Sequence, residues 1–144
     1  MEELFNDIQQ HIADGMPILS LVDENYGQLQ TDADTYPVTF PCVLIDAPVI
    51  EWENLNNRSQ NGKCTITVTL AIDCYDDTHF GSGTEGKVAE RQRLASKLNG
   101  LLHLQKPQGA TGPMIRKKSR NYNLPGGVKA YEMVYEVMVI DTVS

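Results

Sequence analysis

Hydrophobic residues at the start of the chain recur at the spacing of an α-helix. The apolar positions that share one face are Leu4, Phe5, Ile8 and Ile12. Gly15 can end this helix, and Pro17 disfavours its continuation. The pattern therefore predicts one amphipathic N-terminal helix that buries a single apolar face.

The following segment changes to strand-like patterns. Two short runs between residues 19 and 30 flank the loop-like triplet Asp23-Glu24-Asn25, which predicts a hairpin. From Val38 to Ile45 both sets of alternating positions are largely apolar, and this predicts a strand covered on both faces. Prolines at positions 37, 41 and 48 weaken the ladder of this strand or place it near an edge.

The clearest strand pattern begins at Gly62. One face carries Cys64, Ile66, Val68, Leu70, Ile72 and Cys74, and the other carries Thr65, Thr67, Thr69, Ala71 and Asp73. This alternation predicts a long, half-buried strand. A loop from Asp76 to about Gly86 should follow it.

The last part of the chain predicts a second helix and two more strands. The helical stripe consists of Val88, Arg91, Leu94, Ala95, Leu98, Leu101 and Leu102, and it should lie on the apolar face of the sheet. A strand over residues 114–120, a turn over 121–127 and a closing strand over 128–141 complete the pattern. In the closing strand Tyr131, Met133, Tyr135, Val137 and Val139 share one face, opposite Glu132 and Glu136.

This order of elements predicts an α+β fold with a mainly antiparallel sheet and both helices packed on one side of it. A length of 144 residues, with 41% hydrophobic and 22% charged residues, fits a single globular domain over 1–144. The N-terminus lacks the features of an export signal, and no segment is long and apolar enough to cross a membrane. Cys42, Cys64 and Cys74 should be buried thiols rather than a disulfide or a zinc site.

A basic patch stands out against a net charge of -7. Arg116, Lys117, Lys118 and Arg120 are four of the twelve Lys and Arg residues, and the other eight face nineteen Asp and Glu. On a regular strand Arg116, Lys118 and Arg120 would point to one side and Lys117 to the other. Because nucleic-acid binders usually have a basic balance and interleaved aromatic residues, an acidic protein surface, such as that of a second copy, suits this stripe better.

The segment GSGTEGKV, residues 81–88, resembles a phosphate-binding loop but departs from it at a decisive position. A phosphate loop needs Ser or Thr after the lysine to ligate magnesium, and Val88 follows Lys87 here. Glu85 would also bring a negative charge to the phosphates. A surface loop that leads into a helix is the simpler interpretation, and nucleotide binding through Lys87 is the alternative.

Other reactive residue types occur without a pattern that specifies chemistry. Cys74, Asp76, Asp77 and His79 could bind a metal, but a strand followed by a loop defines no shared coordination sphere. His11 and His103 each fall alone on a predicted helix. Glu51 and Glu53 share a strand face around Trp52, as Glu132 and Glu136 do on another strand, without the contrasting environments that acid and base roles require. We therefore predict no enzyme activity, cofactor or metal.

Nearly the whole chain resembles the tail terminator, or tail-completion, proteins of long-tailed bacteriophages. The resemblance rests on the order of MEELFNDIQQHI, YPVTFPCVLID, KCTITVTLAIDCYD, VAERQRLASKLNGLL, PMIRKKSR and KAYEMVYEVMVID. The polar segment from Asp23 to Thr35 departs from clear patterning. The resemblance implies an α+β subunit that assembles as a ring, commonly a hexamer, on the last ring of the tail tube, where it stops tube growth and offers a surface for joining the head.

The same resemblance implies partners and a location. The partners would be further copies of this chain, the tail tube protein and the head–tail connector protein, with DNA passing through the lumen unbound. The chain would be in the host cytoplasm during assembly and then in the virion tail. Subunit contacts would come from Arg116, Lys117, Lys118 and Arg120 against Glu51, Glu53, Glu132 and Glu136, and the loop with Gly81, Gly83, Gly86 and Lys87 would order on contact.

Two further interpretations remain open at this point. A neck connector or minor capsid protein of a phage would rely on the same kind of interfaces. A nucleic-acid-binding protein would use the basic stripe, and its affinity would fall as salt rises.

Overall fold

The computed structural model describes residues 2–31, 35–74 and 85–143. It contains two helices and six strands, arranged as the sequence predicts for an α+β domain. In chain order the elements are α1 (Glu2–Gly15), β1 (Leu21–Glu24), β2 (Cys42–Ile45), β3 (Val49–Asn54), β4 (Ser59–Asp73), α2 (Glu85–Leu102), β5 (Ile115–Leu124) and β6 (Val128–Thr142). No helix in these ranges is both long and apolar enough to cross a membrane.

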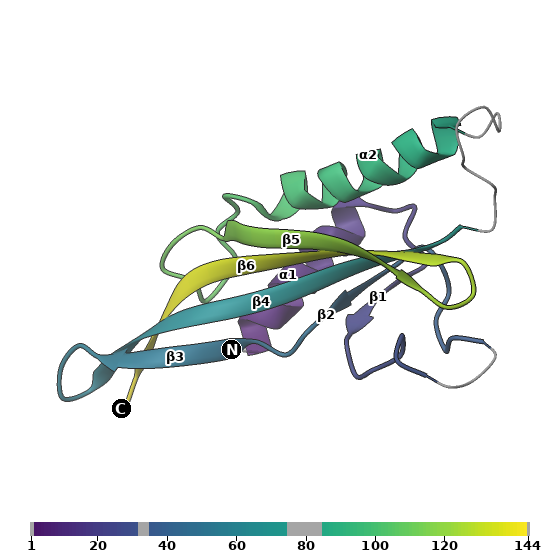
Figure 1. The fold of residues 1–144 in the computed structure, drawn as a ribbon. Coiled ribbons are helices and arrows are strands. Elements are labelled where there is room, and N and C mark those ends of the chain that lie inside the picture. Colours follow the sequence, from purple (N-terminus) through teal and green to yellow (C-terminus); the bar gives the residue numbers. More distant parts are fainter. Residues whose placement is uncertain (1, 32–34, 75–84, 144) are drawn as a thin grey trace.

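One six-stranded sheet organises the molecule. Its order is β1-β2-β4-β6-β5, and β3 pairs with β4 beyond the end of β2. All of these pairs are antiparallel except β1 with β2. Both helices lie on the same side of the sheet, as predicted, and the long strands β4 and β6 extend past them together with β3 (Figure 1).

The main core fills the space between the helices and the sheet. The α1 face predicted from the sequence supplies Leu4, Ile8 and Ile12, all buried. From α2 come Leu98 and Leu102, which pack into the same core. The sheet contributes alternate residues of β4 and β6, among them Cys64, Ile66, Val68, Leu70, Ile72, Tyr131, Met133, Tyr135, Val137 and Val139. The alternation in these two strands therefore predicted the buried face correctly.

A smaller core covers one end of the opposite sheet face. The loop between β1 and β2 contributes Tyr36, Val38 and Phe40, which pack against buried residues of the sheet such as Leu44 and Ala71. Strand β2 is buried at all four of its positions, which confirms the prediction of a strand covered on both faces. The strand begins only at Cys42, however, so Val38 and Phe40 pack from a loop and not from the strand.

The predicted hairpin over residues 19–30 is wrong. Only Leu21–Glu24 forms a strand, and it pairs with β2 in parallel, from Leu21 beside Cys42 to Glu24 beside Ile45. Asn25 to Gln30 instead folds as turns, held by bonds such as Gln28 Nε2 donating to Glu24 O at 2.8 Å. Short-range patterning could not reveal a partner that lies some twenty residues further along the chain.

The last hairpin is longer than predicted. Strand β5 continues through Asn121 to Leu124, so these residues are not a turn. Only Pro125–Gly127 connects β5 to β6, and Gly126 and Gly127 adopt φ values of 83° and 74°. These positive angles suit glycine, which has no Cβ to clash with the backbone.

Candidate interface on the open sheet face

The sheet face opposite the helices is partly open to solvent. The small core covers it only at the end near β1 and β2. We call the rest the open face; residues paired directly across the ladder share it. It carries Glu51 and Glu53 from β3, Lys63, Thr65 and Thr67 from β4, Glu132, Val134, Glu136 and Met138 from β6, and Lys118 and Arg120 from β5.

A β-bulge divides the basic patch between the two faces. Arg116 pairs with Tyr135, whereas Lys118 pairs with Val134, so the register shifts between them and Lys117 is the additional residue. Arg116 therefore lies on the helix side, where it lines a hollow with Gln92 of α2. The prediction that Arg116, Lys118 and Arg120 share a side is wrong, because an extra residue reverses the alternation.

Two acidic residues of β6, Glu132 and Glu136, already have partners within the chain. Arg120 Nε donates to Glu132 Oε1 at 3.1 Å, and Lys63 Nζ lies 3.8 Å from Glu136 Oε2. The hydrogen bond to Glu132 raises the pKa of the Arg120 guanidinium, which also lies 4.7 Å from the centre of the Tyr122 ring. Sequence spacing showed that Glu132 and Glu136 share a face, as they do, but not that neighbouring strands neutralise them.

Glu51 and Glu53 differ from those residues because they lie on an edge strand. Both are exposed, and neither forms an ion pair with a residue that the structure describes. Trp52 points to the other face, where its ring lies so close to Gly62 that a Cβ there would be 2.7 Å from Trp52 Cζ3. The prediction that Glu51 and Glu53 share one strand face is confirmed, since they pair with Lys63 and Asn61.

Large apolar side chains are exposed on β3 and on the parts of β4 and β6 that extend with it beyond the helices (Figure 1). We call this part of the sheet the extended arm. Val49 is 66% exposed and Ile140 is 48% exposed. Leu55 and Val143 lie exposed near the end of the β3–β4 hairpin. Single exposed apolar residues are ordinary, but several on one extended arm are typical of a surface that another protein covers.

Two of the three cysteines and Tyr135 are ionisable groups that lie buried in the two cores. Cys42 and Cys64 are buried, as predicted, and burial raises the pKa of each thiol to about 11. Cys74 lies just beyond the end of β4 and is partly exposed, so the prediction of burial is wrong for this thiol. Burial also raises the pKa of Tyr135 to about 12, and its hydroxyl donates to Asn99 Oδ1 at 2.8 Å.

His11 and His103 hold backbone groups in place. His11 Nε2 donates to Leu101 O at 2.9 Å, which satisfies a carbonyl at the end of α2. His103 lies just after α2 rather than on it, and its Nδ1 accepts from Arg116 N at 3.2 Å. Neither ring lies beside a nucleophile in these contacts.

The sequence motifs with possible chemistry fall largely outside the described residues. The residues outside the described ranges include Gly81 and Gly83, and also Asp76, Asp77 and His79 of the candidate metal group. Gly86 and Lys87 lie in the first turn of α2. Strand β4, which precedes this helix, is antiparallel to all three of its neighbours, unlike the parallel sheet of a phosphate-loop protein. Among the described residues no three His, Cys, Asp or Glu gather in a metal-binding cluster.

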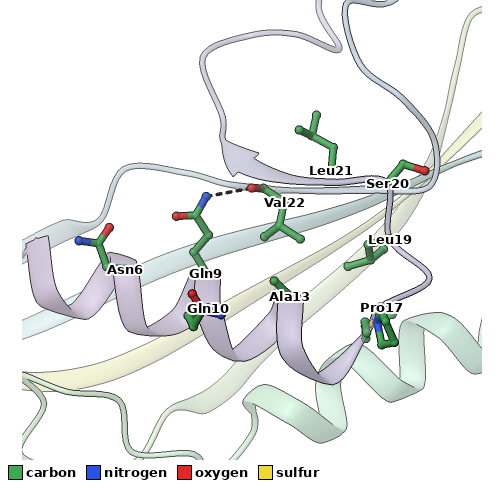
Figure 2. Close-up of a pocket in the computed structure, with 10 residues that line it drawn as sticks. Asn6, Gln9, Gln10, Ala13, Pro17, Leu19, Ser20, Leu21 and Val22 are labelled. Atoms are coloured by element: carbon green, nitrogen blue, oxygen red, sulfur yellow. Dashed lines mark hydrogen bonds between the residues drawn. The ribbon is translucent and has the colours of Figure 1, made fainter.

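A hollow of about 460 Å³ lies between α1 and the segment leading into β1 (Figure 2). Its lining combines the amides of Asn6, Gln9 and Gln10 with apolar residues and contains no charged side chain. Gln9 Nε2 donates to Val22 O at 2.8 Å, so this amide ties β1 to the helix. The hollow offers neither an acid–base pair nor a nucleophile, and we regard it as a packing feature.

Comparisons with known proteins identify a shared fold. No protein-family model matches the chain, and no curated protein matches it either. Among solved structures 27 chains match, including one from the virion of a native gene transfer agent (GTA) particle. That chain aligns over 96% of both sequences with a TM-score of 0.61 and 9% sequence identity. The likeness therefore shows that the two chains share the α+β fold over nearly their whole lengths.

Proposed function

We propose that this chain is a structural subunit of a tailed phage or prophage particle, and specifically a tail terminator. In this role several copies, commonly six in the proteins that the sequence resembles, form a ring on the end of the tail tube. The ring stops tube growth and presents the surface to which the head joins. The fold shared over 96% of both chains with a virion component carries the proposal.

Two properties of the surface support a role in assembly. The open face and the extended arm offer charged and apolar side chains over a broad area, which suits contact with proteins. The net charge of -7 also fits a subunit that lines a DNA passage, because an acidic wall repels phosphate and lets DNA move through. The partners are then further copies, the tail tube protein and the connector.

The experiment is to inactivate the gene in the phage or prophage that carries it and to image the particles by electron microscopy. Tubes that grow beyond their normal length, without joined heads, are expected for a terminator. Tails of normal length that fail to join heads would instead identify a neck connector. Normal, infective particles would refute a structural role of either kind. Expression of the intact chain from a plasmid should restore normal tails.

A further inference from the structure

Two edges of the described sheet, those formed by β5 and β3, carry opposite charges. On β5 the edge is covered only at its beginning, where Leu104 N donates to Met114 O and Arg116 N to His103. From Lys118 to Leu124 the described residues make no backbone hydrogen bond on the outer side of β5. The outer side of β3 is likewise without a backbone partner in the described part of the chain. Unpaired strand edges readily accept another strand.

Strand direction allows these two edges to meet in the favourable orientation. Because β3, β4, β6 and β5 are antiparallel to their neighbours in turn, β3 runs opposite to β5. A second copy that continues the sheet in the same sense would therefore place its β3 antiparallel to β5. Antiparallel pairs have straight hydrogen bonds and are slightly more stable per residue than parallel ones.

One register matches the side chains on the open face. Opposite charges, or an aromatic and a β-branched residue, stabilise a sheet when they face each other across two strands. If Lys118 stands opposite Glu53 of the second copy, the antiparallel ladder fixes the next pairs on that face. The facing pairs are then Lys118 with Glu53, Arg120 with Glu51, and Tyr122 with Val49.

The same register explains features that the isolated chain leaves unused. Val49 is 66% exposed, and contact with Tyr122 of the neighbour would cover it. Glu51 and Glu53 lack partners among the described residues, whereas Glu132 and Glu136 have them. A slip of one residue would move every side chain of one strand to the other face and lose all three pairs.

We propose that the outer edge of β5 pairs antiparallel with β3 of a second copy, so that one sheet continues from subunit to subunit. This inference rests on the proposed function for its biological setting and names the contact by which the ring forms. Each copy contributes one β5 and one β3, so the contact is head-to-tail. Such contacts produce a closed ring when the rotation between subunits permits closure.

Charge reversal tests the pairing. Light scattering over a concentration series should show that wild type associates, and that Lys118→Glu with Arg120→Glu weakens association roughly 10-fold or more, because like charges would face each other. Glu51→Lys with Glu53→Lys should have the same effect. A mixture of the two variants should associate again, since each offers the edge that complements the other. The variant with all four changes should also recover.

The matched control reverses two charges away from the sheet edges. Arg93→Glu with Lys97→Glu changes exposed positions of α2 and makes the same change in net charge as the β5 variant, so it should leave association unchanged. Circular dichroism checks that each variant is folded. If none of the edge reversals changes association, the inference is wrong. The charges would then serve only to prevent other strands from pairing with these edges.

Disulfide cross-linking can detect the pairing even if the copies associate weakly. Facing residues in an antiparallel pair have Cβ atoms about 4.5–5.5 Å apart, close to the spacing of a disulfide. Glu53→Cys with Lys118→Cys should therefore give a closed covalent oligomer on oxidation, and Glu53→Cys with Lys117→Cys should give much less. A chain that stays monomeric at millimolar concentration and fails to form this oligomer overturns the inference.

The two proposals can fail separately. If gene inactivation lengthens tails but the edge-reversed chains restore normal ones, the terminator function stands and the edge pairing is wrong. If edge pairing is found but inactivation leaves particles normal, the pairing stands and the terminator function is wrong.

Discussion

The hydroxyl of Tyr135 provides a sharp test of how α2 is held on the sheet. The Tyr135 side chain is completely buried, and its hydroxyl donates to Asn99 Oδ1 at 2.8 Å. It also lies 3.3 Å from Met133 Sδ. The bond to Asn99 joins the middle of β6 to the last part of α2 across the core. Tyr135→Phe removes this link and leaves the ring itself in place.

The expected magnitude follows from the nature of the bond. A neutral intramolecular hydrogen bond contributes about 0.5–1.5 kcal/mol net, and loss of this one should lower the free energy of unfolding by roughly 1 kcal/mol. For a domain of this size that corresponds to a fall in Tm of roughly 3–4 °C. Urea denaturation followed by circular dichroism measures the change. Asn99→Ala should couple to Tyr135→Phe by a similar energy in a double-mutant cycle.

A neighbouring tyrosine supplies the control. Tyr131 lies on the same face of β6 and is 7% exposed, but its hydroxyl makes no hydrogen bond to a described residue. Tyr131→Phe should change the free energy of unfolding by less than about half of the change expected for Tyr135→Phe. Equal losses in the two variants, or no coupling between Tyr135 and Asn99, would refute the role assigned to this bond.

Three further predictions test other parts of the fold. Gly62→Ala should lower the free energy of unfolding by about 1–3 kcal/mol in urea, because its Cβ would lie 2.7–2.8 Å from three side chains, and a smaller loss would mean that these yield easily. Gly126→Ala should lower the free energy of unfolding by about 1–2 kcal/mol, because the φ of 83° at this position disfavours a residue with a Cβ. An unchanged Tm in thermal denaturation would contradict this and mean that the turn rearranges. Because the Cys42 and Cys64 pKa values rise from 9.0 to about 11, thiolate should be about 100-fold scarcer near pH 8 than for an unperturbed thiol. Mass spectrometry after alkylation should therefore find Cys74 modified first, and equal rates in the folded chain would contradict the burial of the other two.

The candidate interface was only partly visible in the sequence. Clustering of basic residues marked β5, and the spacing of Glu51 and Glu53 placed them together on one face. The division of the basic patch depends on the bulge at Lys117, which is a property of the pairing between β5 and β6. In the same way, the neutralisation of Glu132 depends on which strand lies beside it. Such features require the register of neighbouring strands, which residue spacing within one strand does not contain.

The sequence by itself determined the elements whose burial follows a single period. The 3.6-residue spacing in α1 and α2, and the alternation along β4 and β6, arise because each element buries one continuous face. That was enough to predict the α+β class and the side of the sheet on which the helices lie. Tertiary structure alone decided the parallel pairing of β1 with β2, the bulge, and the free edges of β3 and β5. These depend on contacts between segments far apart in the chain, and the physical reason is that a strand's partner and register are chosen by the surfaces it meets, not by its own period.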